Sequence, residues 1–154
     1  MEQMLSKGKL TPELQELVKV PLITRFLETK VGERMALAQE KGMLYREKPF
    51  VMGFTGEELR RFGFAEADQE KPVAEGDLTL IQGIIDVFWM EEDGITLLDY
   101  KTDRVQHASE LKVRYEAQLK LYEEAVNRVY RGTGQKVKEL LLYSFRLGEF
   151  VQIK

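Results

Sequence analysis

Cysteine is absent from the 154 residues of this chain, and histidine occurs once. The absence of cysteine excludes disulfide bonds, thiolate nucleophiles and zinc sites built from thiolates. The chain also lacks an apolar run of the roughly 20 residues that cross a bilayer, and its N-terminus has no apolar signal-peptide segment. We therefore expect a soluble cytoplasmic protein that has no membrane partner.

A strong charge of either sign is also missing. The 23 basic and 26 acidic residues give a formal net charge of -3, so no overall positive field favours nucleic acid. Any contact with nucleic acid would have to use a local cluster of basic residues. Composition is even along the chain and no internal repeat is visible, and 154 residues with 44% hydrophobic content suffice for one domain with a real core.

Hydrophobic spacing divides the chain into two parts. Residues 1–42 have helical spacing, and we expect them to form a helical N-terminal part of the domain, whereas residues 43–154 mix both periods and form its core. The first part should contain helices that start at Thr11, at Pro21 (ending near Gly32) and at Glu33. We then expect a strand at 43–52 with a proline near an edge or bulge, a short helix within 53–64 and a surface loop at 65–77. Strands at 78–90 and 95–101, a long helix capped by Ser109 that ends near Arg131, and a last strand at 137–145 complete the chain. This order predicts an α/β fold with a mixed sheet flanked by helices.

Two of the expected strands carry charged residues where a buried hairpin would have apolar ones. The first contains Gly-Ile-Ile-Asp at 83–86, and the second contains Asp-Tyr-Lys-Thr at 99–102. Because side chains alternate between the faces of a strand, Asp99 and Lys101 share one face with Leu97. The sequence therefore predicts a carboxylate and an amine side by side on an apolar surface.

The turn between these strands contains Glu-Glu-Asp-Gly and leaves two registers open. A loop at residues 92–93 places Asp86 opposite Asp99. A loop at residues 93–94 places Asp86 opposite Lys101 instead. Either register brings the three side chains together. Opposed like charges destabilise a half-buried sheet unless a cation lies between them, and a hard divalent cation with oxygen ligands and water is the economical occupant.

Simpler interpretations exist for the same residues. Asp99 and Lys101 alone would fit a solvated ion pair on a strand edge, and it is Asp86 in register that favours a metal site. Gln118 and Tyr122 lie at i and i+4 on one face of the long helix. A surface glutamine and a core tyrosine are the usual roles at such positions, so their functional interpretation needs further support.

The ordered series GxxD, DYKT and QxxxY, at residues 83–86, 99–102 and 118–122, resembles the motifs of RecB-type nucleases in the PD-(D/E)XK superfamily. Arg-Glu-Lys-Pro-Phe at 46–50 and Leu-Tyr-Ser-Phe at 142–145 make the chain most similar to the C-terminal nuclease domains of the AddA family, the helicase-nuclease subunits of bacterial AddAB. The resemblance implies a restriction-endonuclease-like core and a metal-dependent DNA exonuclease that acts in double-strand-break repair and homologous recombination.

The resemblance also implies roles for individual residues. Asp86, Asp99 and Lys101 would form the catalytic set. The two acids would bind Mg²⁺ or Mn²⁺ together with the backbone carbonyl of Tyr100, and the lysine would orient or activate the attacking water. Glu47 would assist through a water or a second metal, although it fits a solvated charge equally well.

The remaining implied contacts involve DNA and other proteins. Gln118 and Tyr122 would lie beside the active site and the DNA, and Arg104 would contact phosphates without reading sequence. The implied partners are DNA, single-stranded at the nuclease site, and the protein AddB. ATP would serve only the helicase part of the full-length parent.

One departure from the family pattern leaves alternatives open. RecB-type nucleases usually carry a histidine ligand on a helix well before the first core strand, and this sequence has none there. Its histidine, His107, follows the DYKT motif in a polar stretch and is expected at the surface. We therefore expect a fragment of a larger subunit with impaired activity when isolated. The alternatives are an inactive nuclease fold used for DNA or subunit docking, and a structural module whose acids only solvate a hairpin.

Overall fold

The computed structural model describes residues 20–64 and 77–154, so the helix expected from Thr11 and nearly all of the loop expected at 65–77 lie outside the described residues. The elements in chain order are α3 (Val20–Leu27), α4 (Lys30–Glu40), β1 (Leu44–Thr55), α5 (Gly56–Phe62), β2 (Leu78–Glu91), β3 (Gly94–Lys101), α6 (Ala108–Val129), the 3₁₀ helix η2 (Arg131–Thr133), β4 (Val137–Ser144) and β5 (Glu149–Gln152). They confirm the predicted α/β class with a mixed sheet flanked by helices. Within the described ranges, no helix is long and apolar enough to cross a membrane.

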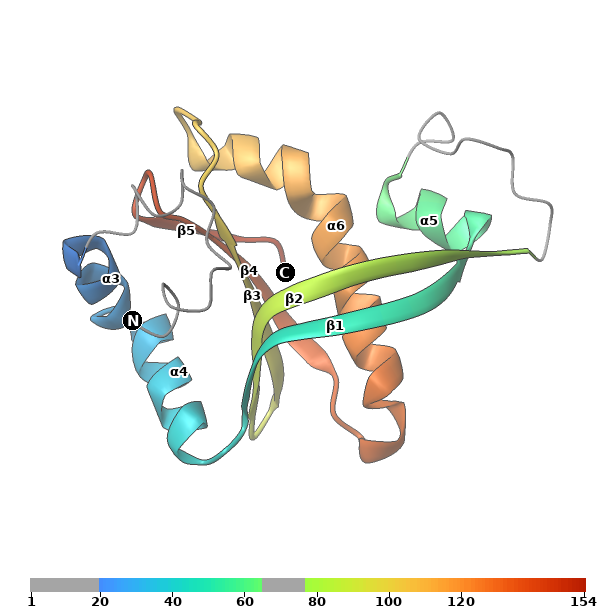
Figure 1. The fold of residues 1–154 in the computed structure, drawn as a ribbon, viewed down its shortest axis with the longest axis horizontal. Coiled ribbons are helices and arrows are strands. Elements are labelled where there is room, and N and C mark those ends of the chain that lie inside the picture. Colours follow the sequence, from blue (N-terminus) through green and yellow to red (C-terminus); the bar gives the residue numbers. More distant parts are fainter. Residues whose placement is uncertain (1–19, 65–76) are drawn as a thin grey trace.

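The strands form a five-stranded sheet in the order β1-β2-β3-β4-β5. Strands β3 and β4 are parallel, and the other neighbours are antiparallel. Parallel neighbours need a crossover connection, which α6 provides. Figure 1 shows α6 on one face of the sheet and α3 with α4 on the other, while β1 and β2 continue together as a long ribbon toward α5.

The sheet separates two hydrophobic cores. On β3, Leu97 is fully buried in the core under α6, and Leu98 is fully buried in the core under α3 and α4. Trp89 is 0% exposed and lies in the same core as Leu98. Because side chains alternate along β3, Asp99 and Lys101 follow Leu97 onto the α6 face.

The hairpin between β2 and β3 has the first of the two predicted registers. Met90 pairs with Ile95 and Phe88 pairs with Leu97, so the loop residues are Glu92 and Asp93. The Glu-Glu-Asp-Gly turn therefore located the hairpin correctly, and the alternative register with Asp93 and Gly94 as the loop is not the one observed. The predicted proline strand is also confirmed, because β1 is an edge strand of the sheet.

The predicted end of the second helix, near Gly32, was wrong. Gly32 does not end a helix. Thr29 caps the start of α4 by accepting a hydrogen bond from the Gly32 N–H at 3.0 Å, and a Cβ at Gly32 would lie 2.6 Å from the Phe26 carbonyl oxygen. This glycine therefore allows α4 to approach α3 closely.

The long helix α6 begins two residues earlier than predicted, at Ala108, because His107 rather than Ser109 is its N-cap residue. The Glu110 carboxylate accepts a hydrogen bond from the Gln106 N–H at 3.3 Å, so a residue of the first helical turn provides an acceptor for a backbone N–H just before the helix. Strand β5 was missed because its four residues are too few to establish an alternating pattern.

Helix α4 is fixed to the sheet by Arg34. Its guanidinium donates to the Glu91 carboxylate through Nε at 2.9 Å, and to Glu139 Oε1 at 2.8 Å and Thr96 Oγ1 at 3.0 Å through Nη2. The Arg34 side chain is 32% exposed and that of Glu91 22% exposed. A charge-assisted, two-point contact of this kind is among the stronger polar interactions in proteins.

Replacing Glu91 by Gln should lower the free energy of unfolding near neutral pH by about 1.5 kcal/mol, because it removes the charged acceptor for Arg34. The hydrogen bond from Arg34 holds the pKa of Glu91 at about 2, below its ordinary value of 4.5. Since the folded-state pKa is lowered, Glu91 adds stability above pH 4.5 that is lost as the pH falls toward 2. Urea unfolding across this range should show the wild-type and Glu91→Gln curves converging. Glu92→Gln, in the exposed turn, is the control, and a pH-independent gap for Glu91→Gln would contradict the expectation.

The glycine of the GxxD motif has a packing role. Gly83 pairs with Phe50 across β1 and β2. A Cβ at Gly83 would lie 2.6 Å from Phe50 Cε1 and 3.2 Å from Tyr122 Cε1. The Phe50 ring meets the Tyr122 ring edge to face, with 5.4 Å between centroids. A glycine at this position therefore leaves room for the two rings to meet over the sheet.

Replacing Gly83 by Ala should lower the free energy of unfolding by about 2 kcal/mol, because the new methyl group overpacks the Phe50 ring. Gly132→Ala is the matched control, since a Cβ there meets no atom within 4 Å, and it should change stability by less than about 0.5 kcal/mol. Urea unfolding of both variants measures the difference. Equal, small effects would mean that Phe50 moves aside freely.

Candidate active site

The two predicted acids meet where β2 and β3 separate. The paired residues of these strands run as far as Val87 and Leu98, and Asp86 and Asp99 are the next residues on the two strands. Beyond this point β2 continues beside β1, whereas β3 continues beside β4. A fork therefore opens in the sheet, with one carboxylate on each arm.

The two carboxylates are in poor contact with solvent. Asp99 is 4% exposed, and Asp86 is half-buried with Oδ2 accepting a hydrogen bond from the Tyr100 N–H at 2.9 Å. Burial, followed by the charge of Asp99, raises the pKa of Asp86 to about 8. Ionising both acids at this place is therefore costly unless a cation joins them.

Lys101 lies against this pair. Its Nζ is 2.7 Å from Asp99 Oδ2 and donates to Gln118 Oε1 at 3.2 Å. Gln118 Nε2 in turn donates to the Tyr122 hydroxyl at 3.0 Å. Burial, followed by the charges of Asp99 and Asp86, raises the pKa of Tyr122 to about 12. The structure thus brings together the two acids and the lysine of the fork with the glutamine and tyrosine of α6.

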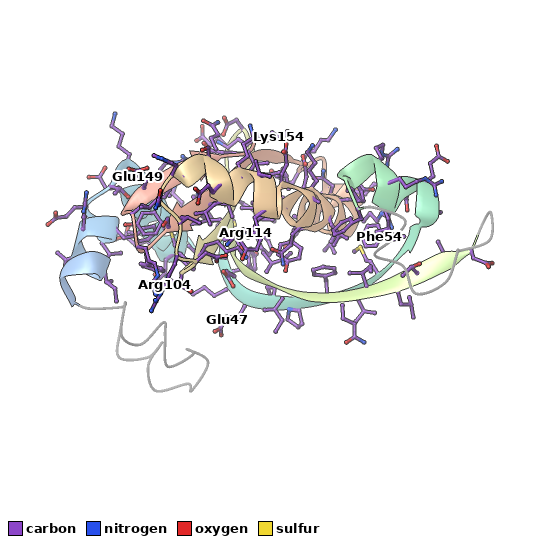
Figure 2. The ribbon with its side chains drawn as sticks, turned by 90° about the horizontal axis from the view of Figure 1, so that it is seen from above. Glu47, Phe54, Arg104, Arg114, Glu149 and Lys154 are labelled. Carbon is purple, nitrogen blue, oxygen red and sulfur yellow. The ribbon has the colours of Figure 1, made fainter. Side chains whose placement is uncertain are left out.

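Glu47 lies on β1 at the position opposite Asp86, between two regular pairs of β1 and β2. Its φ of 50° makes it the only non-glycine residue with positive φ within 20–64 and 77–154. A residue in this conformation is strained, and an irregularity of this kind bends a strand. Figure 2 shows the Glu47 side chain on the side of the ribbon away from α6. The structure therefore does not bring Glu47 to the acid pair, and its role stays a prediction.

Arg104 and His107 lie in the segment between β3 and α6, and both are exposed. The surface position of His107 agrees with the expectation from its polar surroundings. Arg104 contacts none of the acids of the fork in the hydrogen bonds and ion pairs of the described residues. Its contact with DNA stays a prediction.

Two residues at the site were missed as functional candidates. They are Tyr115 on α6 and Asp103 in the segment between β3 and α6. The Tyr115 ring lies beneath the Lys101 ammonium, with Nζ 3.8 Å from the ring centroid, and its hydroxyl donates to Asp103 Oδ2 at 2.6 Å. The spacing signal existed, since Tyr115 precedes Gln118 by three residues and so shares its helix face.

This donor set fits a hard divalent cation. Ionised carboxylates and backbone carbonyls are the ligands that such ions prefer, and Asp99 Oδ2 is a buried carboxylate oxygen that lies 2.7 Å from Lys101 Nζ in an ion pair. In the part of the chain that the structure describes, no third acidic or histidine side chain joins the two acids. The remaining positions around an ion at this place would fall to water, the Tyr100 carbonyl and substrate.

Comparison with known proteins gives the same assignment as the motifs. The sequence model of the PD-(D/E)XK nuclease superfamily matches residues 2–151. The chain is 35% identical, over 179 aligned residues, to an ATP-dependent helicase/nuclease subunit from Lachnoclostridium phytofermentans, in an alignment that covers 100% of this chain and 13% of the relative. It is 34% identical over 153 residues to the protein of the same name from Clostridium botulinum, covering 99% of this chain and 11% of the relative.

The chain thus spans 11–13% of the length of these curated relatives. The matches confirm the resemblance that rested on the GxxD, DYKT and QxxxY series. The five-stranded mixed sheet, with an acid on each arm of the fork and a lysine beside them, is consistent with the same fold family. The chain belongs to the PD-(D/E)XK nuclease superfamily.

Proposed function

We propose that this domain is a divalent-metal-dependent deoxyribonuclease that hydrolyses phosphodiester bonds in single-stranded DNA as an exonuclease. The observation that carries the proposal is the buried pair of acids at the fork, with Lys101 Nζ 2.7 Å from Asp99 Oδ2. The two acids are costly to ionise together unless a cation joins them, since burial and the charge of Asp99 raise the pKa of Asp86 to about 8. Family membership makes nuclease chemistry the natural use of such a site.

Mg²⁺ or Mn²⁺ is the cofactor that we propose, held by Asp86, Asp99 and the carbonyl of Tyr100. When bound, such an ion supplies a water of lowered pKa and neutralises charge on the phosphate oxygens. The Tyr100 N–H keeps the Asp86 carboxylate turned across the fork through its 2.9 Å hydrogen bond. The two acids therefore approach the ion from different strands of a rigid sheet, which fixes their separation.

Lys101 serves as the cationic group of the site. Its ammonium lies 2.7 Å from Asp99 Oδ2 and donates to Gln118 Oε1, so its positive charge is beside the fork, where a water or a phosphate oxygen would bind. Gln118 is itself held by the Tyr122 hydroxyl. We propose that Gln118 and Tyr122 hold Lys101 in place and contact the DNA beside it. We propose that Arg104 contacts a phosphate outside the fork.

The biological setting is proposed from the relatives. They are named as ATP-dependent helicase/nuclease subunits, and we infer that this domain is the nuclease module of such a cytoplasmic protein. Its partner would be the protein AddB, and ATP would be used by the helicase part alone. The module would degrade the strand delivered by the motor during processing of DNA ends for double-strand-break repair and recombination.

A second candidate is a nuclease fold that serves only for DNA or subunit docking. The observation in its favour is the short ligand set, because the described residues place two acids and no histidine at the fork. A cation held by two side chains would bind weakly without substrate phosphates or further ligands. The two candidates differ in whether metal-dependent cleavage occurs.

Replacing Asp99 by Asn or Lys101 by Met should lower the rate of Mn²⁺-dependent cleavage of single-stranded DNA by a factor of at least about 100. The first change removes a metal ligand, and the second removes the cation beside the scissile phosphate. Oligonucleotides labelled at the 5′ or the 3′ end, resolved on gels, give both the rate and the polarity of digestion.

Asp93→Asn in the exposed hairpin turn and Lys30→Met on α4 are matched controls of the same chemistry and should cleave at the wild-type rate. Cleavage that survives in Asp99→Asn and Lys101→Met would contradict the assignment of the site. Wild-type protein that binds DNA without cleaving it in Mg²⁺ or Mn²⁺ would favour the docking candidate.

Metal binding should also be visible as stability. Mn²⁺ should raise the free energy of unfolding of the wild-type protein by about 2.7 kcal/mol at a concentration 100 times its dissociation constant. Asp86→Asn should lose this gain, and in EDTA it should be at least as stable as wild type because it lacks the repulsion from Asp99. Thermal unfolding by calorimetry measures both effects. Asp93→Asn should keep the gain, and an equal gain in Asp86→Asn would place the ion elsewhere.

A further inference from the structure

The Lys101 ammonium has an aromatic ring as its third neighbour. Its Nζ lies 3.8 Å from the centroid of the Tyr115 ring, well inside the distance of about 6 Å at which a cation is attracted to the face of a ring. The other neighbours of Nζ are Asp99 Oδ2 at 2.7 Å and Gln118 Oε1 at 3.2 Å. Lys101 is therefore held from three sides, by a carboxylate, an amide and a ring.

The Tyr115 ring is itself held in place. Its hydroxyl donates to Asp103 Oδ2 at 2.6 Å, and Arg114 Nη1 donates to the same oxygen at 2.6 Å. Asp103 follows Lys101 by two residues. The segment after β3 is therefore joined to the first half of α6 through Lys101 at the face of the ring and through Asp103 at its hydroxyl. Burial, followed by the hydrogen bond to Asp103, raises the pKa of Tyr115 to about 12. The ring is therefore a neutral phenol at working pH.

The Tyr115 ring is an uncharged neighbour that can hold the Lys101 ammonium whether or not a metal ion is bound. A cation bound at the fork would neutralise much of the negative charge of the Asp99 carboxylate. The carboxylate would then attract the Lys101 ammonium less strongly. The face of the ring attracts the ammonium without offering an oxygen that competes for the metal ion. A ring at this position can thus keep the amine beside the fork in the metal-bound state.

We propose that Tyr115 is a positioning residue of the nuclease site, whose ring holds the Lys101 amine toward the substrate and is oriented by Asp103. The inference rests on the proposed function and adds a residue outside the GxxD, DYKT and QxxxY series to it. Tyr115 is half-buried and packs at the rim of the core under α6, so a purely structural role is the alternative that an experiment must separate.

Three variants make that separation. Tyr115→Leu removes the ring, Tyr115→Phe keeps the ring and removes only the hydroxyl, and Tyr130→Leu removes another partly buried tyrosine of the same core, whose ring packs against Phe88 rather than Lys101. Under single-turnover conditions with saturating Mn²⁺, Tyr115→Leu should cleave single-stranded DNA about tenfold more slowly. The KM for DNA should be unchanged, and Tyr115→Phe and Tyr130→Leu should stay within about twofold of wild type.

A second measurement does not require activity. Protons on the Lys101 side chain beneath a ring face should resonate upfield of their ordinary position, and selective labelling of lysine allows NMR to detect them. The shift should persist in Tyr115→Phe and disappear in Tyr115→Leu. Its absence in wild type would overturn the inference, as would a Tyr115→Leu rate equal to wild type or a rate loss matched by Tyr130→Leu.

The failure of the proposed function is a different outcome. If wild-type protein binds no metal and cleaves no DNA, the nuclease proposal fails, and the lysine chemical shifts alone decide whether the ring holds the amine. If wild type cleaves and the shift is present but Tyr115→Leu cleaves normally, the nuclease proposal stands and the positioning role is overturned.

Discussion

The site depends on two carboxylates that the fold holds together where the sheet divides. Asp86 and Asp99 lie next to Val87 and Leu98, the last paired residues of β2 and β3, and burial, followed by the charge of Asp99, raises the pKa of Asp86 to about 8. The Tyr100 N–H and the Lys101 ammonium stabilise the pair only in part. A sheet that keeps such charges half-buried gives up stability that a divalent cation would restore, which is the usual mark of a functional site.

The fork exists because β1 and β2 leave the rest of the sheet together. Glu47 adopts a left-handed backbone opposite Asp86, and the ribbon beyond it continues toward α5 (Figure 1). Three positions further on β2, Gly83 leaves space for the Phe50 ring to reach Tyr122. Glu47 with its left-handed backbone and Gly83 without a side chain therefore belong to one arrangement. In it, the ribbon of β1 and β2 bends away from the rest of the sheet, and α6 packs against both.

Sequence patterns predicted the parts of this arrangement that follow from local rules. The Glu-Glu-Asp-Gly turn located the hairpin of β2 and β3 but left two registers open, and alternation placed Asp99 and Lys101 on one face. The sequence patterns did not predict the left-handed backbone of Glu47. A glutamate has no local preference for this conformation, so the bend depends on how the neighbouring strands pack. Nor did the sequence patterns mark Tyr115 as part of the site, since a ring that packs and a ring that holds a cation have the same helical spacing.

Helix α6 explains why packing and chemistry cannot be separated here. Leu119 is fully buried and fixes the rotation of the helix against the sheet, while Tyr115, Gln118 and Tyr122, at spacings of three and four, face the fork. Tyr122 belongs to both sets, because its ring packs on Phe50 and its hydroxyl accepts from Gln118. Since α6 is also the crossover between β3 and β4, its position is set by the sheet topology and not by a loop. The residues around the amine are thus placed by a strand and a long helix and not by loops, which is what a site of fixed geometry needs.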